Sequence, residues 1–163
     1  MGLLEPHGRG RRPFRRDALS EPASAPVFVV HSLAHAVAAL EAAAAADRDI
    51  ILLSAPNAGI YAGAGWFKAM IEAARDAVPL ARFREILDCG DQAGAVQAAL
   101  RAGVAAAIFT GRADVAERLA AIAQQAGVSL LTTRPQPLLD FGELFFASSD
   151  TLRERCAGAL ASV

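Results

Sequence analysis

The chain has 163 residues, of which 54% are hydrophobic and 20% are charged, and its formal net charge is −1. A chain of this length can form one compact domain with a substantial core, and its apolar content excludes intrinsic disorder of the main body. The balanced charge gives no overall attraction to nucleic acid or to an anionic membrane surface.

The apolar runs and the cysteines narrow the class of protein further. Runs such as 50–55 and 104–110 are far shorter than the roughly 20 residues of a membrane-spanning helix. The two cysteines, Cys89 and Cys156, are too few for a disulfide framework and lack the close spacing of a zinc or redox motif. We therefore expect a cytoplasmic protein without a membrane segment.

Residues 1–25 are predicted to form a flexible basic tail in front of a single α/β domain that spans 26–163. The tail holds a cluster of arginines: Arg9, Arg11, Arg12, Arg15 and Arg16. Such a cluster is typical of a solvated arm, or of weak binding to RNA or to an acidic partner. The stretch 11–14 partly resembles a twin-arginine export signal, but no long apolar segment follows it, so we do not expect export.

From residue 26 onward, short apolar runs alternate with helical patterns. The strands are predicted at 27–30, 50–54, 84–88, 104–109 and 128–132, and a helix with an apolar face follows each of the first four. A last helix is predicted at 151–161, capped by Ser149 or Asp150. Ser32 can cap the first helix, and Gly103 and Gly127 can end the third and fourth.

This alternation predicts right-handed crossovers and an α/β fold. We expect a three-layer αβα sandwich with a mostly parallel sheet of five or six strands in a flavodoxin-like or Rossmann-like order. The region after the fifth strand is less regular, because only about ten residues separate that strand from Leu144–Ala147, and parallel crossovers usually take a dozen or more. Leu144–Ala147 is therefore interpreted as an antiparallel edge strand or as part of a subunit contact.

In open parallel sheets, ligands bind beyond the carboxyl ends of the strands. The loop at 55–65 that follows the second strand is long for a strand-helix connection, and such loops are often functional. Its glycines allow close backbone approach at a helix N-terminus, where free N–H groups favour a phosphate or a carboxylate. The candidate ligand-binding residues of this loop are Asn57, Gly59, Tyr61, Gly63 and Gly65.

The glycine spacing matches neither the dinucleotide-binding fingerprint nor the phosphate loop of nucleotide hydrolases. A tight loop that packs on a neighbouring subunit, or that lets the helix close on the sheet, fits the residues equally well.

Asp88, Cys89 and Asp91 follow the third strand within four residues. Asp88 is a candidate general base or a partner for a ligand hydroxyl. Cys89 is either a nucleophile, with its pKa lowered by the helix that follows, or a buried and inert thiol. Asp91 is a candidate ligand contact, but an N-cap is the commoner role for Asp at such a position.

His31 and His35 are four residues apart at the start of the first helix. This spacing allows two imidazoles to share a metal ion if Asp88, Asp91 or Cys89 supplies a third ligand. Alternatively, His31 alone contacts a ligand or the Asp88 carboxylate. We assign no metal and no cofactor on these residues.

Arg112 and Arg134 follow the fourth and fifth strands and could clamp a carboxylate or a phosphate together. Surface pairing of the arginines with Asp114 or Asp140 is the alternative.

Two functions follow from these residues. The first is binding of a small anionic metabolite at the carboxyl edge of the sheet, with or without acid–base catalysis by Asp88, His31 and Cys89. The second is a non-catalytic interaction module that forms a homo-oligomer through an apolar C-terminal part. The aromatic residues of that part are Phe141, Phe145 and Phe146.

Overall fold

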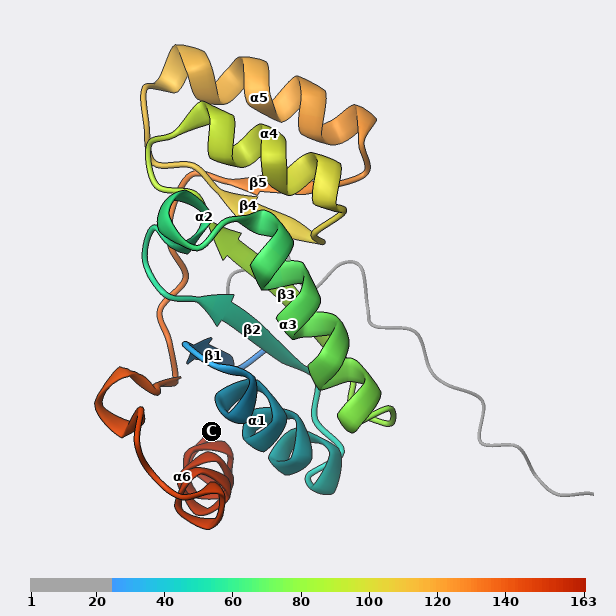
Figure 1. Ribbon diagram of the computed structural model, residues 1–163, viewed down its shortest axis with the longest axis vertical. Helices are drawn as coiled ribbons and strands as arrows, with labels where there is room; N and C mark the ends of the chain where they lie inside the picture. The colour runs from blue at the N-terminus through green and yellow to red at the C-terminus, as the bar shows by residue number, and fades with distance from the viewer. Residues whose placement is uncertain (1–24) are drawn as a thin grey trace, which may run out of the picture.

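The computed structural model describes residues 25–163, and apart from Ala25 the predicted basic tail lies outside the described residues. One sheet of six strands runs through this part of the chain. Figure 1 shows how the helices are arranged around the strands. Its strands are β1 (Val27–Val30), β2 (Ile50–Ser54), β3 (Phe83–Asp88), β4 (Ala106–Ile108), β5 (Ser129–Leu131) and β6 (Leu139–Asp140). No helix within 25–163 combines the length and the apolar character needed to cross a bilayer.

Helices follow the strands in close agreement with the apolar periodicity. They are α1 (Leu33–Ala45), α2 (Ala58–Tyr61), α3 (Ala64–Ala77), α4 (Ala93–Ala102), α5 (Ala113–Gln125) and α6 (Ser149–Ala161). Ser32 caps α1 by accepting a hydrogen bond from the backbone N–H of His35, and Gly103 ends α4 in the left-handed conformation, both as predicted. The cap of α6 is Ser148 instead of the expected Ser149 or Asp150, because its hydroxyl accepts from the backbone N–H of Thr151.

All neighbouring strands pair in parallel, in the order β5-β4-β3-β2-β1-β6. The predicted α/β class and mostly parallel sheet are confirmed. The strand order, however, is neither flavodoxin-like nor Rossmann-like. In those orders the chain moves from the middle of the sheet to one edge and then to the other, whereas here β1 to β5 follow one another across the sheet in a single direction.

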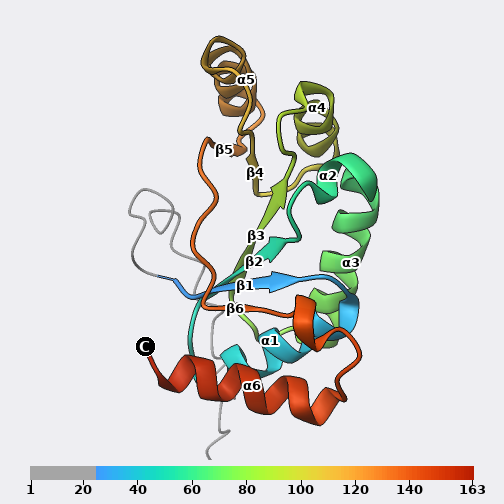
Figure 2. The same cartoon turned by 90° about the vertical axis from the view of Figure 1, so that its left-hand side faces the viewer.

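This one-way order determines where the helices lie. Right-handed crossovers that step in the same direction place their helices on the same face of the sheet. The buried side chains of α1, α3, α4, α5 and α6 accordingly belong to one core cluster, which also contains Phe28, Leu52 and Leu87. Figure 2 shows α1, α3 and α4 on one side of the strands and the connection from β5 to β6 on the other.

The opposite face of the sheet has a smaller apolar cluster of its own. Its buried members are strand residues only: Val27, Val29, Ile51, Leu53, Ile86, Ala106 and Ile108. Within residues 25–163 the helices therefore form one layer, instead of the two helical layers of the expected αβα sandwich.

The C-terminal part corrects a second expectation. Residues 144–147 form neither an antiparallel strand nor any other strand, because Gly142–Leu144 is a turn of 3₁₀ helix. The last strand lies earlier, at Leu139–Asp140, and runs parallel to β1. The connection from β5 is short because it crosses the sheet without a helix, and Leu138 anchors it by donating a backbone hydrogen bond of 2.7 Å to Val27.

Candidate functional site

Three polar side chains end their strands on the helix-free side of the sheet. Asp140 is the register partner of Val29, and Asp88 is the register partner of Ile108. Both partners belong to the smaller apolar cluster, and register partners in a sheet point to the same side. His31 directly follows β1, and its Nε2 reaches Asp140 at the end of the neighbouring strand. The sequence thus brings Asp88, His31 and Asp140 to one edge and one face.

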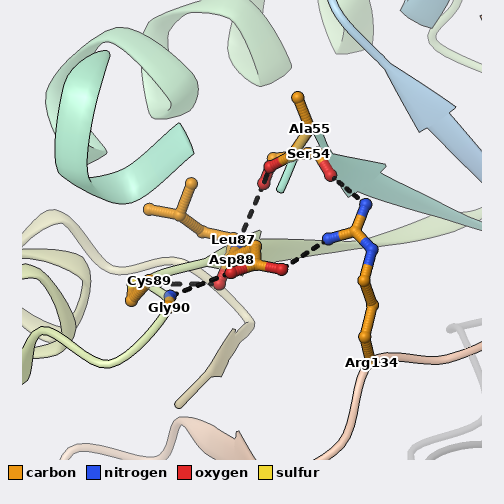
Figure 3. A network of polar contacts seen from close by, with 7 residues as sticks. All are labelled: Ser54, Ala55, Leu87, Asp88, Cys89, Gly90 and Arg134. Atoms are coloured by element: carbon orange, nitrogen blue, oxygen red, sulfur yellow. Dashed lines mark hydrogen bonds and ion pairs between the residues drawn. The ribbon is translucent and has the colours of Figure 1, made fainter. Parts of the chain in front are cut away.

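Arg134 joins two of the strand ends (Figure 3). Its Nη1 donates to Asp88 Oδ2 at 2.6 Å, and its Nη2 donates to the backbone carbonyl of Ser54 at 2.8 Å. The other carboxylate oxygen of Asp88 accepts from the backbone N–H of Gly90 at 2.9 Å. The hydroxyl of Ser54 in turn accepts from the backbone N–H of Asp88 at 2.9 Å.

This network assigns different roles to its two charged members. The Asp88 side chain is only 6% exposed and both of its oxygens are engaged, whereas the Arg134 side chain is 25% exposed. Asp88 therefore holds the guanidinium in place through oxygens that are already engaged, which favours a positioning role over the general base or hydroxyl partner predicted from the sequence. The cation reaches solvent, and the carboxylate does not.

His31 and Asp140 form a second pair at the same edge. His31 Nε2 lies 2.7 Å from Asp140 Oδ1, which also accepts from the backbone N–H of Gly142 at 2.8 Å. Partial burial raises the pKa of Asp140, but the hydrogen bonds from His31 and Gly142, together with the charges of His31 and Arg134, outweigh burial and lower that pKa below its usual value. The charge of Arg134 therefore connects the Asp88 network to this pair.

His35 lies beneath the His31–Asp140 pair and is completely buried. Its Nδ1 accepts a hydrogen bond of 3.2 Å from the backbone N–H of His31. Its ring stacks on Phe141 at a centroid distance of 4.9 Å and meets the edge of Phe145 at 5.5 Å. Nε2 of His35 has no hydrogen-bond partner within the described residues.

No group of three or more His, Cys, Asp or Glu side chains in residues 25–163 is placed to hold a metal ion. The spacing of His31 and His35, which allows a shared metal, is used instead for the hydrogen bond between them.

Cys89 lacks the exposed thiol of lowered pKa that the nucleophile interpretation requires. The thiol is fully buried. Burial, and secondly the negative charge of Asp88, raise the pKa of Cys89 to about 12. Because the thiolate is the reactive form, these surroundings favour the second interpretation of this residue, a buried and inert thiol.

The loop after β2 contains the short helix α2 and three glycines with different roles. A Cβ atom at Gly59 would lie 2.9 Å from Cys89 Sγ, so this glycine allows α2 to pack on the turn after β3. Gly63 has a φ of +87°, and Gly65 faces open space at the start of α3. Asn57 packs its side chain against Gly90. Gly59 and Asn57 therefore serve packing, which leaves Gly63 and Gly65 at an uncapped helix N-terminus.

Three other candidates do not join the cluster. Arg112 makes two hydrogen bonds of 3.0 Å to Asp114 and its side chain is 80% exposed, which is the alternative that the sequence left open. Asp91 is not the N-cap of α4, because Gln92 occupies that position and its side-chain amide donates to Asp91. Tyr61 is 68% exposed at the end of α2.

Two members of the cluster were not assigned these roles from the sequence. Asp140 was considered only as a surface partner for an arginine, and Ser54 was read only as the last residue of a strand. The signal that would have found Asp140 is the pairing of β6 with β1, which aligns Asp140 with Val29. Nothing local to residues 139–140 encodes that pairing.

The comparisons with known proteins bear on the fold. No protein-family model matches the sequence, and no curated protein matches it significantly. A solved structure assigned as a fructose-1,6-bisphosphate aldolase from Coccidioides immitis matches with a TM-score of 0.54 and 17% identity, over 69% of this chain and 42% of that one. A structure assigned as a tagatose 6-phosphate kinase from Sinorhizobium meliloti 1021 gives a TM-score of 0.49 and 18% identity, over 86% of this chain and 47% of that one.

The present chain thus spans less than half the length of either solved protein. The likeness to the aldolase structure supports the α/β fold. At this level of identity it carries no assignment of activity.

Proposed function

We propose that this chain binds a small anionic metabolite at the carboxyl edge of its sheet, between Arg134 and the His31–Asp140 pair. The observation that carries the proposal is the fixed guanidinium of Arg134. Two hydrogen bonds, to Asp88 and to the Ser54 carbonyl, hold it on the face where His31 and Asp140 also end their strands. A positioned arginine can bind a carboxylate or a phosphate without losing much side-chain freedom.

The His31–Asp140 pair gives this site a group that can carry a proton. Asp140 is hydrogen-bonded to Nε2 and fixes the orientation of the imidazole, so Nδ1 is the nitrogen that remains for a ligand. The His31 side chain is 23% exposed, which allows such a contact. In the proposed site His31 is the acid–base group, Arg134 binds the anion, and Asp88 positions Arg134.

The test is isothermal titration of the protein with inorganic phosphate and with a panel of phosphorylated and carboxylic metabolites. We expect saturable binding of at least one compound, and loss of that binding in R134Q. The matched control is R112Q, because Arg112 also follows a strand but pairs with the exposed Asp114. Equal affinity of R134Q and R112Q, or no binding by any compound, would contradict the proposal.

A second candidate function, homo-oligomerisation, is favoured by the exposed aromatic residues after β6. Phe146 is 96% exposed and Phe145 is 48% exposed, and their rings contact one another at a centroid distance of 5.1 Å. Phe141, which the sequence grouped with them, is fully buried and cannot take part.

Light scattering after size exclusion tests this second candidate. If a second copy covers the two rings, the wild type has a multiple of the monomer mass and F146D is a monomer. The control is L80D, because Leu80 is 80% exposed in the turn between α3 and β3. A monomeric wild type excludes this candidate.

A further inference from the structure

Residues 141–147 link β6 to α6, and ring contacts with His35 attach this segment to α1. The His35 ring stacks on Phe141, with only 18° between the ring planes, and contacts the edge of Phe145. Phe141 is fully buried and also stacks on Phe28 at 6.3 Å. Leu144 and Ala147 also pack against the main core, whereas Gly142, Glu143 and Phe146 are exposed.

The hydrogen bonds of His35 require a neutral imidazole. Nδ1 accepts from the backbone N–H of His31, so the ring proton must be on Nε2. In a protonated ring both nitrogens carry hydrogen, and the Nδ1–H group would point at the N–H of His31. Nε2 makes no well-formed hydrogen bond among the described residues, and the backbone carbonyl of Phe145 is the group that interacts with its proton. Protonation therefore replaces a hydrogen bond by a contact between two donors and buries a charge.

The charged groups that act on His35 come from two neighbouring elements. Burial lowers the pKa of His35 below 6.5, and the charge of His31 lowers it further. The backbone carbonyl of Phe145 and the carboxylate of Asp140 act in the opposite direction, but they are outweighed. The charge of Arg134 acts in turn on Asp140, whose pKa it lowers.

We propose that His35 is a proton-controlled latch, which holds residues 141–147 against α1 while it is neutral and releases them when it takes up a proton. Water can solvate the imidazolium only after Phe141 and Phe145 have moved away from it. Release of this segment also displaces Asp140, which immediately precedes it, and so separates Asp140 from His31. Acidification thereby breaks the His31–Asp140 pair. The effect of this break on ligand binding rests on the proposed function, whereas the latch itself does not depend on that function.

Hydrogen exchange of the ligand-free protein at pH 7.5 and pH 5.5, corrected for intrinsic rates, tests the latch. The reporting amides are those of Phe141, which donates to Val29, and Leu144, which donates to Phe141. We expect their protection to fall by up to about tenfold at pH 5.5, which is the most that one histidine with an ordinary pKa in the released state can contribute between these two pH values. The amide of Cys89, bonded to Ile108 in the centre of the sheet, should stay protected. Unchanged protection of Phe141 and Leu144, or equal loss at Cys89, would overturn the proposal.

Three variants separate a latch from a merely structural histidine. In H35Q the amide oxygen can accept from His31 but does not titrate, so protection should become independent of pH in this range. In H31Q the release should occur at higher pH, because the charge that opposes protonation is gone. In D140N the release should occur at lower pH, because the carboxylate charge that favours protonation of His35 is gone. Retention of the wild-type pH dependence in H35Q would refute the role of His35, whatever the result of the ligand titrations.

Discussion

Arg134 donates a hydrogen bond of 2.6 Å to the Asp88 carboxylate from a position 46 residues further along the chain. The contact fastens the helix-free connection between β5 and β6 to the central strand β3. It also places a cation over the carboxyl ends of β2 and β3, because Nη2 of the same guanidinium reaches the Ser54 carbonyl. One side chain therefore both closes the fold and supplies the charge of the candidate site.

Removal of this arginine should destabilise the protein. In R134A the buried Asp88 retains only the hydrogen bond from Gly90, and we expect the free energy of unfolding to fall by about 2–4 kcal/mol. R112A, which breaks an exposed pair, should change it by less than about 0.5 kcal/mol. Urea unfolding of the two variants and the wild type measures both values. Similar stabilities of R134A and R112A would show that the Asp88 network adds little.

Phe141 and Phe146, which lie near the two ends of the segment after β6, should differ in how much they contribute to the free energy of unfolding. Phe141 is fully buried between Phe28 and His35, so F141A should lose about 3–5 kcal/mol of stability through the cavity that it leaves. F146A truncates a side chain that is 96% exposed and should be close to neutral in a monomer. Thermal unfolding followed by circular dichroism compares them. A large loss in F146A would point to a covered surface there.

Two glycines of the loop after β2 should respond in opposite ways to alanine. At Gly59 a Cβ atom would meet Cys89 Sγ at 2.9 Å and the carbonyl oxygen of Asp88 at 3.0 Å, so G59A should destabilise by about 1–3 kcal/mol. At Gly65 the added methyl group enters open space within the first turn of α3, and G65A should stabilise by up to about 1 kcal/mol. The denaturant midpoints of the two variants show whether each substitution stabilises or destabilises the protein. Destabilisation by G65A would contradict the open space at this position.

The buried cysteines should be unreactive and should make the protein sensitive to alkaline pH. Burial raises the pKa of Cys89 and of Cys156 to about 12, above the usual value of 9.0. The unfolded chain therefore loses these protons first, and stability falls as the pH rises from 9 towards 12, by at most about 1.4 kcal/mol per pH unit and thiol.

Alkylation by iodoacetamide and unfolding as a function of pH check this prediction. At pH 8 the native protein should react much more slowly than the denatured chain. The alkaline decline in stability should be shallower in C89A and C156A. Rapid labelling of the folded protein would show that the thiols open to solvent.

The α/β class could be predicted from the sequence because strands such as Ile50–Ser54 and helices such as α4, ended by Gly103, carry their signals locally. The strand order could not, since it depends on which way each crossover steps, and no residue encodes that direction by itself. Layering follows from strand order, so the prediction of helices on two faces failed with it.

The candidate site was predictable to a similar extent. The rule that ligands bind at the carboxyl ends of strands selected His31, Asp88 and Arg134, which the structure places at one edge. It also selected Arg112 and Asp91, whose neighbours Asp114 and Gln92 engage them at the surface. Side-chain partners one or two residues apart in sequence compete with those formed across the sheet, and only the folded geometry decides between them.

The pairing of β1 with β6 makes completion of this sheet depend on a strand that is synthesised long after β1. His31 and Asp140 are 109 residues apart in sequence, and β1 lies between β2 and β6 in the sheet. Until residues 139–140 have left the ribosome, one side of β1 has no strand partner and the buried ring of Phe28 lacks Phe141. A nascent chain at this stage would offer a chaperone an open backbone edge beside exposed aromatic surface, while β2 to β5 could already pair with one another.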